Sequence, residues 1–333
     1  MTVSIIIVNY KTPQLVADCI NSVLKQDESA VNTEIIVVDN HSEDGIEETL
    51  IRNFPSVRYI QMGYNAGFAR ANNAGIRIAS GDIILLLNSD TLVEENAINK
   101  CCMQFMSDEY VACGVQLLNE DRTPQISGNY AMKGGLNYLL PLPFLGKALK
   151  FLAGLLKMKK PNVPDATGTV EVDWINGAFL MVKKTAIEKA GLLDEDFFLY
   201  AEEAEWCSRL KKTGKLCIYG DHHVVHLQGA TSEEAFDSTG KGYFNLFDKR
   251  GLQIMVSNFL RIRKEFGLFW FFVDLFFYII TIPVFFVGLL LTALVGQNKY
   301  SFAQWLGYTK NIMRLVGLSG KMITGKKYFY KVL

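Results

Sequence analysis

The sequence predicts an α/β fold in which helices flank a mostly parallel central sheet, followed by a C-terminal hydrophobic helical region. Three observations predict it. Short β-branched runs alternate with amphipathic segments over residues 3–117, several of these runs end in polar side chains, and residues 266–296 are almost entirely apolar. Alternation of this kind is typical of a parallel sheet covered by helices on both faces.

Each expected element follows from its local pattern. Pro13 favours a helix start, and the β-branched run before it reads as a strand. The strands are expected at residues 3–8, 34–38, 57–61, 83–87 and 111–117, and the helices at 13–24, from 44, at 66–79 and from 94. The domain division expected from these patterns is 1–240, with an amphipathic insertion at about 134–160, followed by a helical, membrane-associating region at 241–333.

Composition excludes some classes of protein. The 34 Lys and Arg balance the 34 Asp and Glu, so the chain lacks the basic field that nucleic-acid binders use. Hydrophobic residues make up 50% of the chain, which indicates membrane contact. The six cysteines show no CxxC spacing and read as buried free thiols in a reducing compartment.

Polar side chains end three of the predicted strands. Asn9, Asp39 and the run Asn88 to Asp90 each follow an apolar run. Ligands of open parallel sheets bind beyond the carboxyl ends of the strands, so these residues predict a site on one rim. No glycine-rich phosphate loop follows the first strand. A nucleotide diphosphate bound there would therefore need another holder, such as a metal ion on Asp90.

Seven segments in order resemble family 2 glycosyltransferases of the rhamnosyltransferase-like branch. They are VSIIIVNYK, EIIVVDNHSEDG, NAGFARANNAGI, LLLNSD, WINGAFLMVKK, FFLYAEEAEWCSRLKKTG and HLQGATS. The resemblance implies the GT-A nucleotide-diphospho-sugar transferase fold. It also implies a nucleoside-diphosphate sugar donor, dTDP- or UDP-linked, whose pyrimidine base would contact Asp39. The donor-binding residues it implies are Val8, Asn9, Tyr10, Asp39, Asn65, Gly67, Phe68, Asn72, Asn88 and Ser89.

The same resemblance implies a metal site. Asp90 matches the aspartate of the DxD-type motif, with Asn88 at the first acidic position, and His226 matches the family's histidine beside the diphosphate. Hard oxygen ligands favour Mg²⁺ or Mn²⁺ as the cofactor. A zinc cluster of His222, His223 and His226 is the weaker alternative, because no fourth ligand closes it.

The resemblance also implies a catalytic base and an acceptor side. Glu203 takes the position of the catalytic base, with Glu202 as the other candidate. The alternative is that these acids only interact with the dipole at the N-terminus of a helix. Trp174, Asn176 and Gly177 are the expected acceptor contacts, although a tryptophan there fits a protein core nearly as well. The QxxRW motif of processive synthases is absent from the sequence, which favours addition of a single sugar.

Two hydrophobic stretches indicate membrane attachment. Residues 144–160 set Leu and Phe at helical spacing among lysines, which suits an anionic membrane surface and equally suits a helix packed on the protein. Residues 266–296 are long enough to span a bilayer, but basic residues flank both ends. We therefore expect monotopic attachment through a re-entrant or interfacial helical pair bent near Pro283, with a core helix pair or a homodimer interface as the alternative.

Together these features predict an inverting glycosyltransferase at the cytoplasmic face of a bacterial cell membrane, attached peripherally or monotopically. It would transfer a single sugar, rhamnose by the branch, to a glycan or lipid-linked saccharide in cell-surface polysaccharide or O-antigen biosynthesis. A catalytically inactive, sugar-nucleotide-binding partner of a polysaccharide assembly complex is the alternative.

Overall fold

The computed structural model describes residues 1–26, 31–155, 162–227, 245–297 and 299–332. The chain folds into two compact units. Unit 1 comprises Met1–Tyr130, Asn162–Phe198 and Glu202–Thr231, and unit 2 comprises Ala131–Pro161, Leu199–Ala201 and Ser232–Leu333. The expected division at residue 240 stays a prediction; in the structure the segment 131–161 groups with the C-terminal helices.

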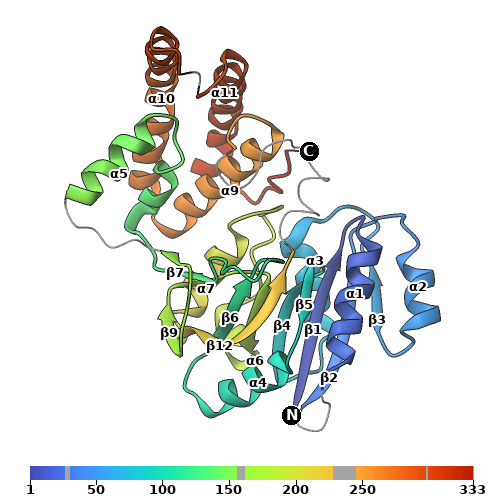
Figure 1. The fold of residues 1–333 in the computed structure, drawn as a ribbon. Helices are drawn as coiled ribbons and strands as arrows, with labels where there is room; N and C mark the ends of the chain where they lie inside the picture. The colour runs from blue at the N-terminus through green and yellow to red at the C-terminus, as the bar shows by residue number, and fades with distance from the viewer. Residues whose placement is uncertain (27–30, 156–161, 228–244, 298, 333) are drawn as a thin grey trace. The chain divides into compact units, whose positions relative to one another are not determined.

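Unit 1 holds the sheet and its covering helices (Figure 1). Its strands are β1 (Thr2–Asn9), β2 (Asn32–Asp39), β3 (Arg58–Gln61), β4 (Ile83–Asn88), β5 (Thr91–Val93), β6 (Ala112–Leu118), β7 (Gly128–Asn129), β8 (Asn162–Val163), β9 (Thr169–Val172), β10 (Trp174–Ile175), β11 (Phe179–Lys183) and β12 (Leu216–His226). Its helices are α1 (Pro13–Leu24), α2 (Ile46–Asn53), α3 (Gly67–Ile78), α4 (Ala97–Ser107), α6 (Lys184–Ala190) and α7 (Glu202–Leu210).

Within the described residues the main sheet has the strand order β3-β2-β1-β4-β11-β6-β12-β5, and β9 pairs with β12. The first four strands of that order are mutually parallel, while β11 runs antiparallel to both of its neighbours. This arrangement confirms the predicted α/β class, and the sheet is mixed, with four parallel and four antiparallel strand pairings among the described residues. β1 and β4 are buried almost throughout, which is why both read as continuous apolar runs.

Strand register brings the polar strand ends together. Asn9 of β1 pairs with Asp39 of β2, and Val8 pairs with Asn88 of β4. On the other side of the sheet, His226 at the end of β12 pairs with Thr91 of β5, one residue after Asp90. His226 thus joins the rim predicted from Asn9, Asp39 and Asn88 to Asp90, although it lies 217 positions after Asn9 in the chain.

Unit 2 is helical. It contains η1 (Lys133–Leu139), α5 (Leu145–Leu155), α9 (Lys249–Glu265), α10 (Leu268–Leu294) and α11 (Phe302–Thr324). Tyr278 and Ile282 of α10 accept hydrogen bonds at their carbonyls from Tyr308 Oη (2.8 Å) and Trp305 Nε1 (3.0 Å) of α11. The two helices therefore pack as a pair.

The expected bend near Pro283 is wrong. α10 continues through this proline, and the chain reverses only after Leu294. A proline removes one helical hydrogen bond and crowds the preceding turn. Here the indole of Trp305 donates to the carbonyl of Ile282, so this part of the helix is supported by its neighbour.

The two faces of α10 differ. Its inner face is buried, with Phe271, Tyr278 and Phe285 among the buried side chains. Its outer face is an exposed apolar stripe of Phe269, Phe272, Phe276, Ile279, Ile280, Phe286, Val287, Leu290, Leu291 and Leu294. The helix is about 40 Å long at 1.5 Å per residue. It is the one helix of the described residues that is long and apolar enough to cross a membrane.

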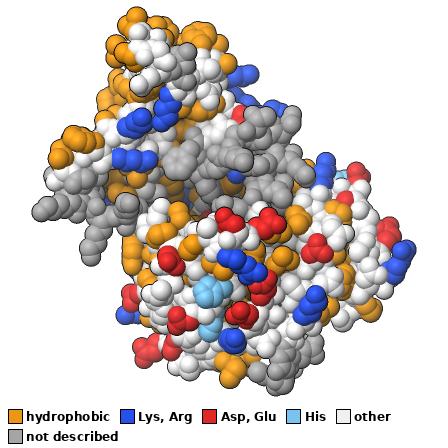
Figure 2. Space-filling view, viewed as in Figure 1, with side chains coloured by type: hydrophobic (Ala, Val, Ile, Leu, Met, Phe, Trp, Pro, Cys, Tyr) orange, Lys and Arg blue, Asp and Glu red, His pale blue; other side chains and the backbone are white. Residues whose placement is uncertain are grey.

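Charge is distributed very unequally between the units. The sequence of unit 2 holds 19 Lys and Arg against 6 Asp and Glu, so unit 1 keeps 15 of the 34 bases and 28 of the 34 acids. The neutral chain is therefore the sum of a unit of charge −13 and a unit of charge +13. Figure 2 shows acidic side chains scattered over unit 1, and hydrophobic side chains gathered where α10 ends and α11 begins.

Candidate active site

Asn9 and Asp39 form the centre of a buried polar network at the ends of β1 and β2. Asn9 Nδ2 donates to Asp39 Oδ1 (2.8 Å), and it also lies within hydrogen-bonding distance of Ser42 Oγ and Asp44 Oδ2. Asn9 Oδ1 accepts from the backbone amide of Thr12 (3.2 Å), just before α1. Asn9 thereby ties the chain after β1 to the loop after β2.

Asp39 has protein donors on both carboxylate oxygens. Its Oδ1 accepts from Asn9 and from Ser42 Oγ (2.5 Å), and its Oδ2 accepts from Ser42 N (3.1 Å) and Gln61 Nε2 (2.8 Å). A carboxylate offers about four acceptor positions. A nucleotide base that formed a hydrogen bond with Asp39 would have to displace one of these donors. The side chain of Gln61 is exposed, so it is the donor that can rotate away.

The N-terminus of α3 is fixed by hydrogen bonds with Asn40 and Asn65. Asn40 bonds Ala66 N and Gly67 O, and Asn65 Oδ1 accepts from Gly67 N (3.1 Å). Gly67 has φ +73°, and a Cβ there would lie 2.1 Å from the carbonyl oxygen of Phe198. Within this structure the small residue makes room for the protein's own chain. Asn72 is buried, with its amide on the carbonyl of Phe68 (3.0 Å).

The predicted metal ligands lie together. His226 Nε2 is 3.3 Å from Asp90 Oδ1 and 3.4 Å from Asn88 Nδ2, and all three come from strand ends. Leu227 N donates to Asp90 O (2.9 Å), which fixes the two strand ends side by side. Ser89 Oγ lies 3.4 Å from Thr12 Oγ1, linking this segment to the start of α1.

The other histidines of β12 do not join this site. His222 Nε2 lies 3.0 Å from Gln104 Oε1, and burial lowers the pKa of His222. The described residues contain no group of three or more His, Cys, Asp and Glu side chains that could hold a metal ion. A metal at Asp90 and His226 would therefore draw its remaining ligands from water and from a bound diphosphate, as is common for Mg²⁺ sites.

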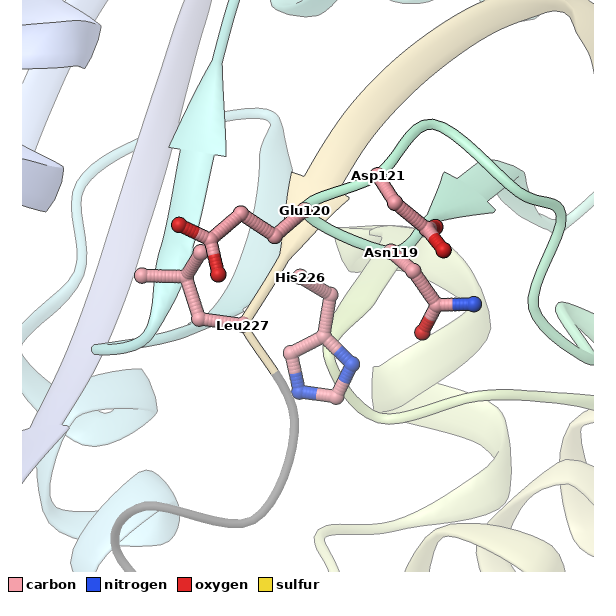
Figure 3. Close-up of a pocket in the computed structure, with 5 residues that line it drawn as sticks. All are labelled: Asn119, Glu120, Asp121, His226 and Leu227. Carbon is pink, nitrogen blue, oxygen red and sulfur yellow. The ribbon is translucent and has the colours of Figure 1, made fainter.

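A pocket adjoins His226 (Figure 3). It is lined by His226 and Leu227 from the end of β12 and by Asn119, Glu120 and Asp121 from the turn after β6. The same turn leads to Gln125, a buried residue whose Oε1 lies 2.9 Å from His226 Nδ1. Sequence reasoning missed Gln125, since nothing in the local pattern links it to a histidine 101 residues further on.

Glu203 faces the predicted acceptor residues. Trp174 Nε1 donates to Glu203 Oε1 (3.3 Å), and a Cβ at Gly177 would lie 3.5 Å from the Glu203 side chain. Tyr200 and Ala201, directly before α7, have φ of 72° and 65°. Left-handed conformations in non-glycine residues are costly and gather at functional sites. The two strained residues therefore lie immediately before the acidic first turn of α7.

The three acids of α7 have different surroundings. Glu205 forms a two-point contact with Arg209 one helical turn later (2.7 and 2.8 Å). Glu202 is buried, whereas Glu203 is partly exposed beside Trp174. An acid that exchanges a proton with a substrate must be accessible, so the geometry favours Glu203.

Asn176 stabilises the turn before β11. Its Oδ1 accepts a hydrogen bond from Ala178 N (3.0 Å), and its Nδ2 donates to Ile126 O (3.2 Å).

Comparison with protein families matches residues 4–170 to the model described as glycosyl transferase family 2. The chain belongs to glycosyl transferase family 2. The resemblance stated from the sequence motifs is confirmed, and the rhamnosyltransferase-like branch is represented among its relatives.

Three curated relatives illustrate its similarity. The low-salt glycan biosynthesis hexosyltransferase Agl10 of Haloferax volcanii is 28% identical over 213 residues, 63% of this chain and 61% of the relative. Rhamnosyltransferase WbbL of Escherichia coli is 24% identical, covering 67% of this chain and 83% of the relative. The N-acetylglucosaminyl-diphospho-decaprenol L-rhamnosyltransferase of Mycobacterium tuberculosis is 24% identical, covering 59% and 68%.

Solved structures confirm the fold. The mannosyltransferase PcManGT from Pyrobaculum calidifontis, in complex with GDP-Man and Mn²⁺, aligns with TM-score 0.53 at 14% identity, covering 97% of this chain and 87% of that one. The structure of GalNAc-T7 with UDP, GalNAc and Mn²⁺ aligns with TM-score 0.52 at 16% identity, covering 84% and 57%. At these identities the likeness concerns the fold, which is GT-A-like.

Proposed function

We propose that this chain is an inverting, metal-dependent glycosyltransferase. It would transfer one sugar from a nucleoside diphosphate donor to a glycan acceptor. The convergence of Asn9, Asp39, Asn88, Asp90 and His226 on one rim of a family 2 sheet supports this proposal best. Such a rim is where open α/β sheets bind ligands.

The residues present fit a divalent metal. A carboxylate and an imidazole, Asp90 and His226, lie 3.3 Å apart at buried strand ends, and both would hold the ion together with donor oxygens. When bound, Mg²⁺ or Mn²⁺ neutralises charge on the departing diphosphate. Two structural neighbours were solved with Mn²⁺, which supports this choice of cofactor.

Glu203 would act as the general base. Its carboxylate takes the proton of the attacking acceptor hydroxyl as that oxygen bonds to the anomeric carbon, while the bond from this carbon to the diphosphate breaks on the opposite side. The result is inversion at that carbon. Trp174 would orient this carboxylate by donating its indole N–H to Glu203 Oε1.

The sugar and the acceptor are proposed from the relatives. WbbL and the mycobacterial relative are named rhamnosyltransferases, and the latter name describes a diphospho-decaprenol-linked saccharide. We therefore infer a dTDP-rhamnose or related UDP-sugar donor and a lipid-linked acceptor in cell-surface polysaccharide biosynthesis.

Unit 2 supports attachment to the cytoplasmic face of a membrane. Its excess of 13 positive charges suits anionic lipids, and the exposed stripe of α10 presents apolar side chains along the whole helix. The inner face of α10 packs on its own unit and contains Asp274. This two-faced character favours peripheral or monotopic attachment in the plane of the membrane over a complete crossing.

The deciding experiment measures release of nucleoside diphosphate by the purified full chain from a panel of nucleotide sugars with Mn²⁺. The variants compared are Asp90→Ala and, as a control, Asp18→Ala, whose carboxylate bonds Gln14 on helix α1. Metal-dependent release that Asp90→Ala alone abolishes supports the proposal. Release in neither protein, even with membrane lipid extract as acceptor source but with nucleotide still bound, would point to an inactive sugar-nucleotide-binding partner instead.

A further inference from the structure

The side chain of Gln125 forms two hydrogen bonds with His226. The side chain of Gln125 is 5% exposed, and its Nε2 donates to the backbone carbonyl of His226 (2.6 Å) while its Oε1 lies 2.9 Å from His226 Nδ1. Backbone bonds hold Gln125 itself, with its N–H on Leu117 O (2.8 Å) and its carbonyl accepting from Gln116 Nε2 (2.9 Å). A rigidly held amide therefore contacts both the ring and the main chain of one predicted metal ligand.

The orientation of this amide is determined by its neighbours. Nε2 faces three acceptors: His226 O, Asn119 Oδ1 (2.8 Å) and Leu118 O (3.3 Å). A flipped amide would place an oxygen against all three. The amide of Asn119 is fixed in turn, because its Nδ2 faces Thr123 Oγ1 (2.8 Å) and Thr123 O (3.2 Å). Oε1 of Gln125 is thus the atom that faces the imidazole.

This orientation determines the tautomer of His226. An amide oxygen can only accept, so Nδ1 must carry the proton, and in the neutral ring Nε2 then carries the lone pair. That lone pair lies 3.3 Å from Asp90 Oδ1, which is also an acceptor. Two acceptors at this distance repel each other unless a cation or a proton lies between them. Asn88 Nδ2, 3.4 Å from Nε2, is the neighbouring donor.

We propose that Gln125 is a positioning residue that holds His226 as the Nδ1–H tautomer, so that Nε2 and Asp90 together present their lone pairs to a divalent cation. This inference rests on the metal-dependent function proposed above. Partners of the non-coordinating ring nitrogen fix the orientation of metal-bound histidines, and their loss costs about tenfold to a hundredfold in metal affinity.

The first test is Mn²⁺ binding to the full chain without nucleotide, followed by the electron paramagnetic resonance signal of free Mn²⁺. Gln125→Met keeps the length of the side chain and removes both hydrogen bonds to His226. Gln104→Met is the matched control, because Gln104 also bonds a β12 histidine, His222, away from Asp90. We expect about tenfold to hundredfold weaker binding in Gln125→Met and unchanged binding in Gln104→Met. Equal binding by wild type and a folded Gln125→Met would overturn the proposal.

The second test reads the tautomer in the wild-type protein and uses a variant only to assign signals. Imidazole ¹⁵N shifts of the four histidines in wild type, recorded at about pH 8 where an ordinary histidine is neutral, report the tautomer directly. The His226 signals are identified by their loss in His226→Asn. A protonated Nδ1 and a bare Nε2 support the proposal, and the opposite tautomer overturns it. If wild type has the expected tautomer but binds no Mn²⁺, the proposed metal function is wrong, while the conclusion that Gln125 holds His226 in this tautomer is retained.

Discussion

The two units of this chain differ in net charge and in the kind of side chain that they expose. Unit 1 carries an excess of 13 negative charges and buries its polar residues in hydrogen-bonded networks at a sheet edge. Unit 2 carries an excess of 13 positive charges and exposes large apolar side chains. Averages over the whole chain conceal this contrast. A net charge of zero and a moderate hydropathy describe neither unit, and only the division of the chain shows two surfaces built for different surroundings.

The largest expected effect tests whether the units act separately. Asp90→Ala removes the carboxylate at the proposed metal site, and electrostatic stabilisation by a bound metal is worth several kcal/mol. We expect donor turnover to fall at least about a thousandfold, since each 1.36 kcal/mol is tenfold. Flotation with anionic vesicles should stay unchanged, because unit 2 is intact. Loss of both properties at once would break the proposed division of labour.

The next effect separates the acids of α7. Glu203→Gln keeps the size of the side chain and removes the base, so we expect kcat to fall about a hundredfold to a thousandfold, within the range for general base catalysis. Glu205→Gln is the matched control on the same helix, where the acid only pairs with Arg209. It should keep kcat and lose about 1 kcal/mol of stability. Equal losses of kcat in the two variants would exclude Glu203 as the base.

The sequence predicted what depends on a local pattern. Asn9, Asp39 and Asn88 were placed on one rim because the carboxyl ends of parallel strands share an edge, and the register of β1 with β2 and β4 bears this out. The antiparallel insertion of β11 between β4 and β6 depends on contacts between distant segments, and no local pattern encodes it. Gln125 was missed for the same reason, and the local pattern does not encode the hydrogen bond from Trp305 of α11 to Ile282, beside Pro283.

The third prediction tests the apolar stripe of unit 2. Phe276→Glu places a charge at the middle of that stripe, where the native ring is 61% exposed. Burying a phenylalanine in an apolar phase is worth about 1.5–3 kcal/mol. We therefore expect partition onto phosphatidylglycerol vesicles to weaken about tenfold to a hundredfold.

Two controls sharpen this measurement. Ile51→Glu changes an apolar residue of unit 1 that is 70% exposed and should leave vesicle partition as it is in wild type. Raising the salt concentration should also weaken binding, because the basic side chains of unit 2 act through screened charges. If Phe276→Glu partitions like wild type while the chain changes its oligomeric state, the stripe is a homodimer interface instead.

The last prediction concerns the one buried acid on α10. Asp274 is fully buried, neither of its carboxylate oxygens has a hydrogen-bond partner, and burial raises its pKa from 3.8 to about 7. Between these two values the folded chain binds a proton that the unfolded chain has released. The free energy of unfolding should therefore fall as the pH rises from about 4 to about 7 and then level off. Asp274→Asn carries no such charge, so we expect it to be more stable than wild type by about 4 kcal/mol at pH 8 and by progressively less towards pH 4.

A matched acid in the same unit should behave in the opposite way. Asp248 caps α9, with Oδ1 accepting from Gly251 N (2.8 Å), so Asp248→Ala should destabilise the chain by about 1 kcal/mol. Urea unfolding at several pH values measures both variants. Asp274→Asn with the same pH dependence as wild type would mean that another group titrates, and that the interior of unit 2 tolerates a carboxylate as readily as the networks of unit 1 do.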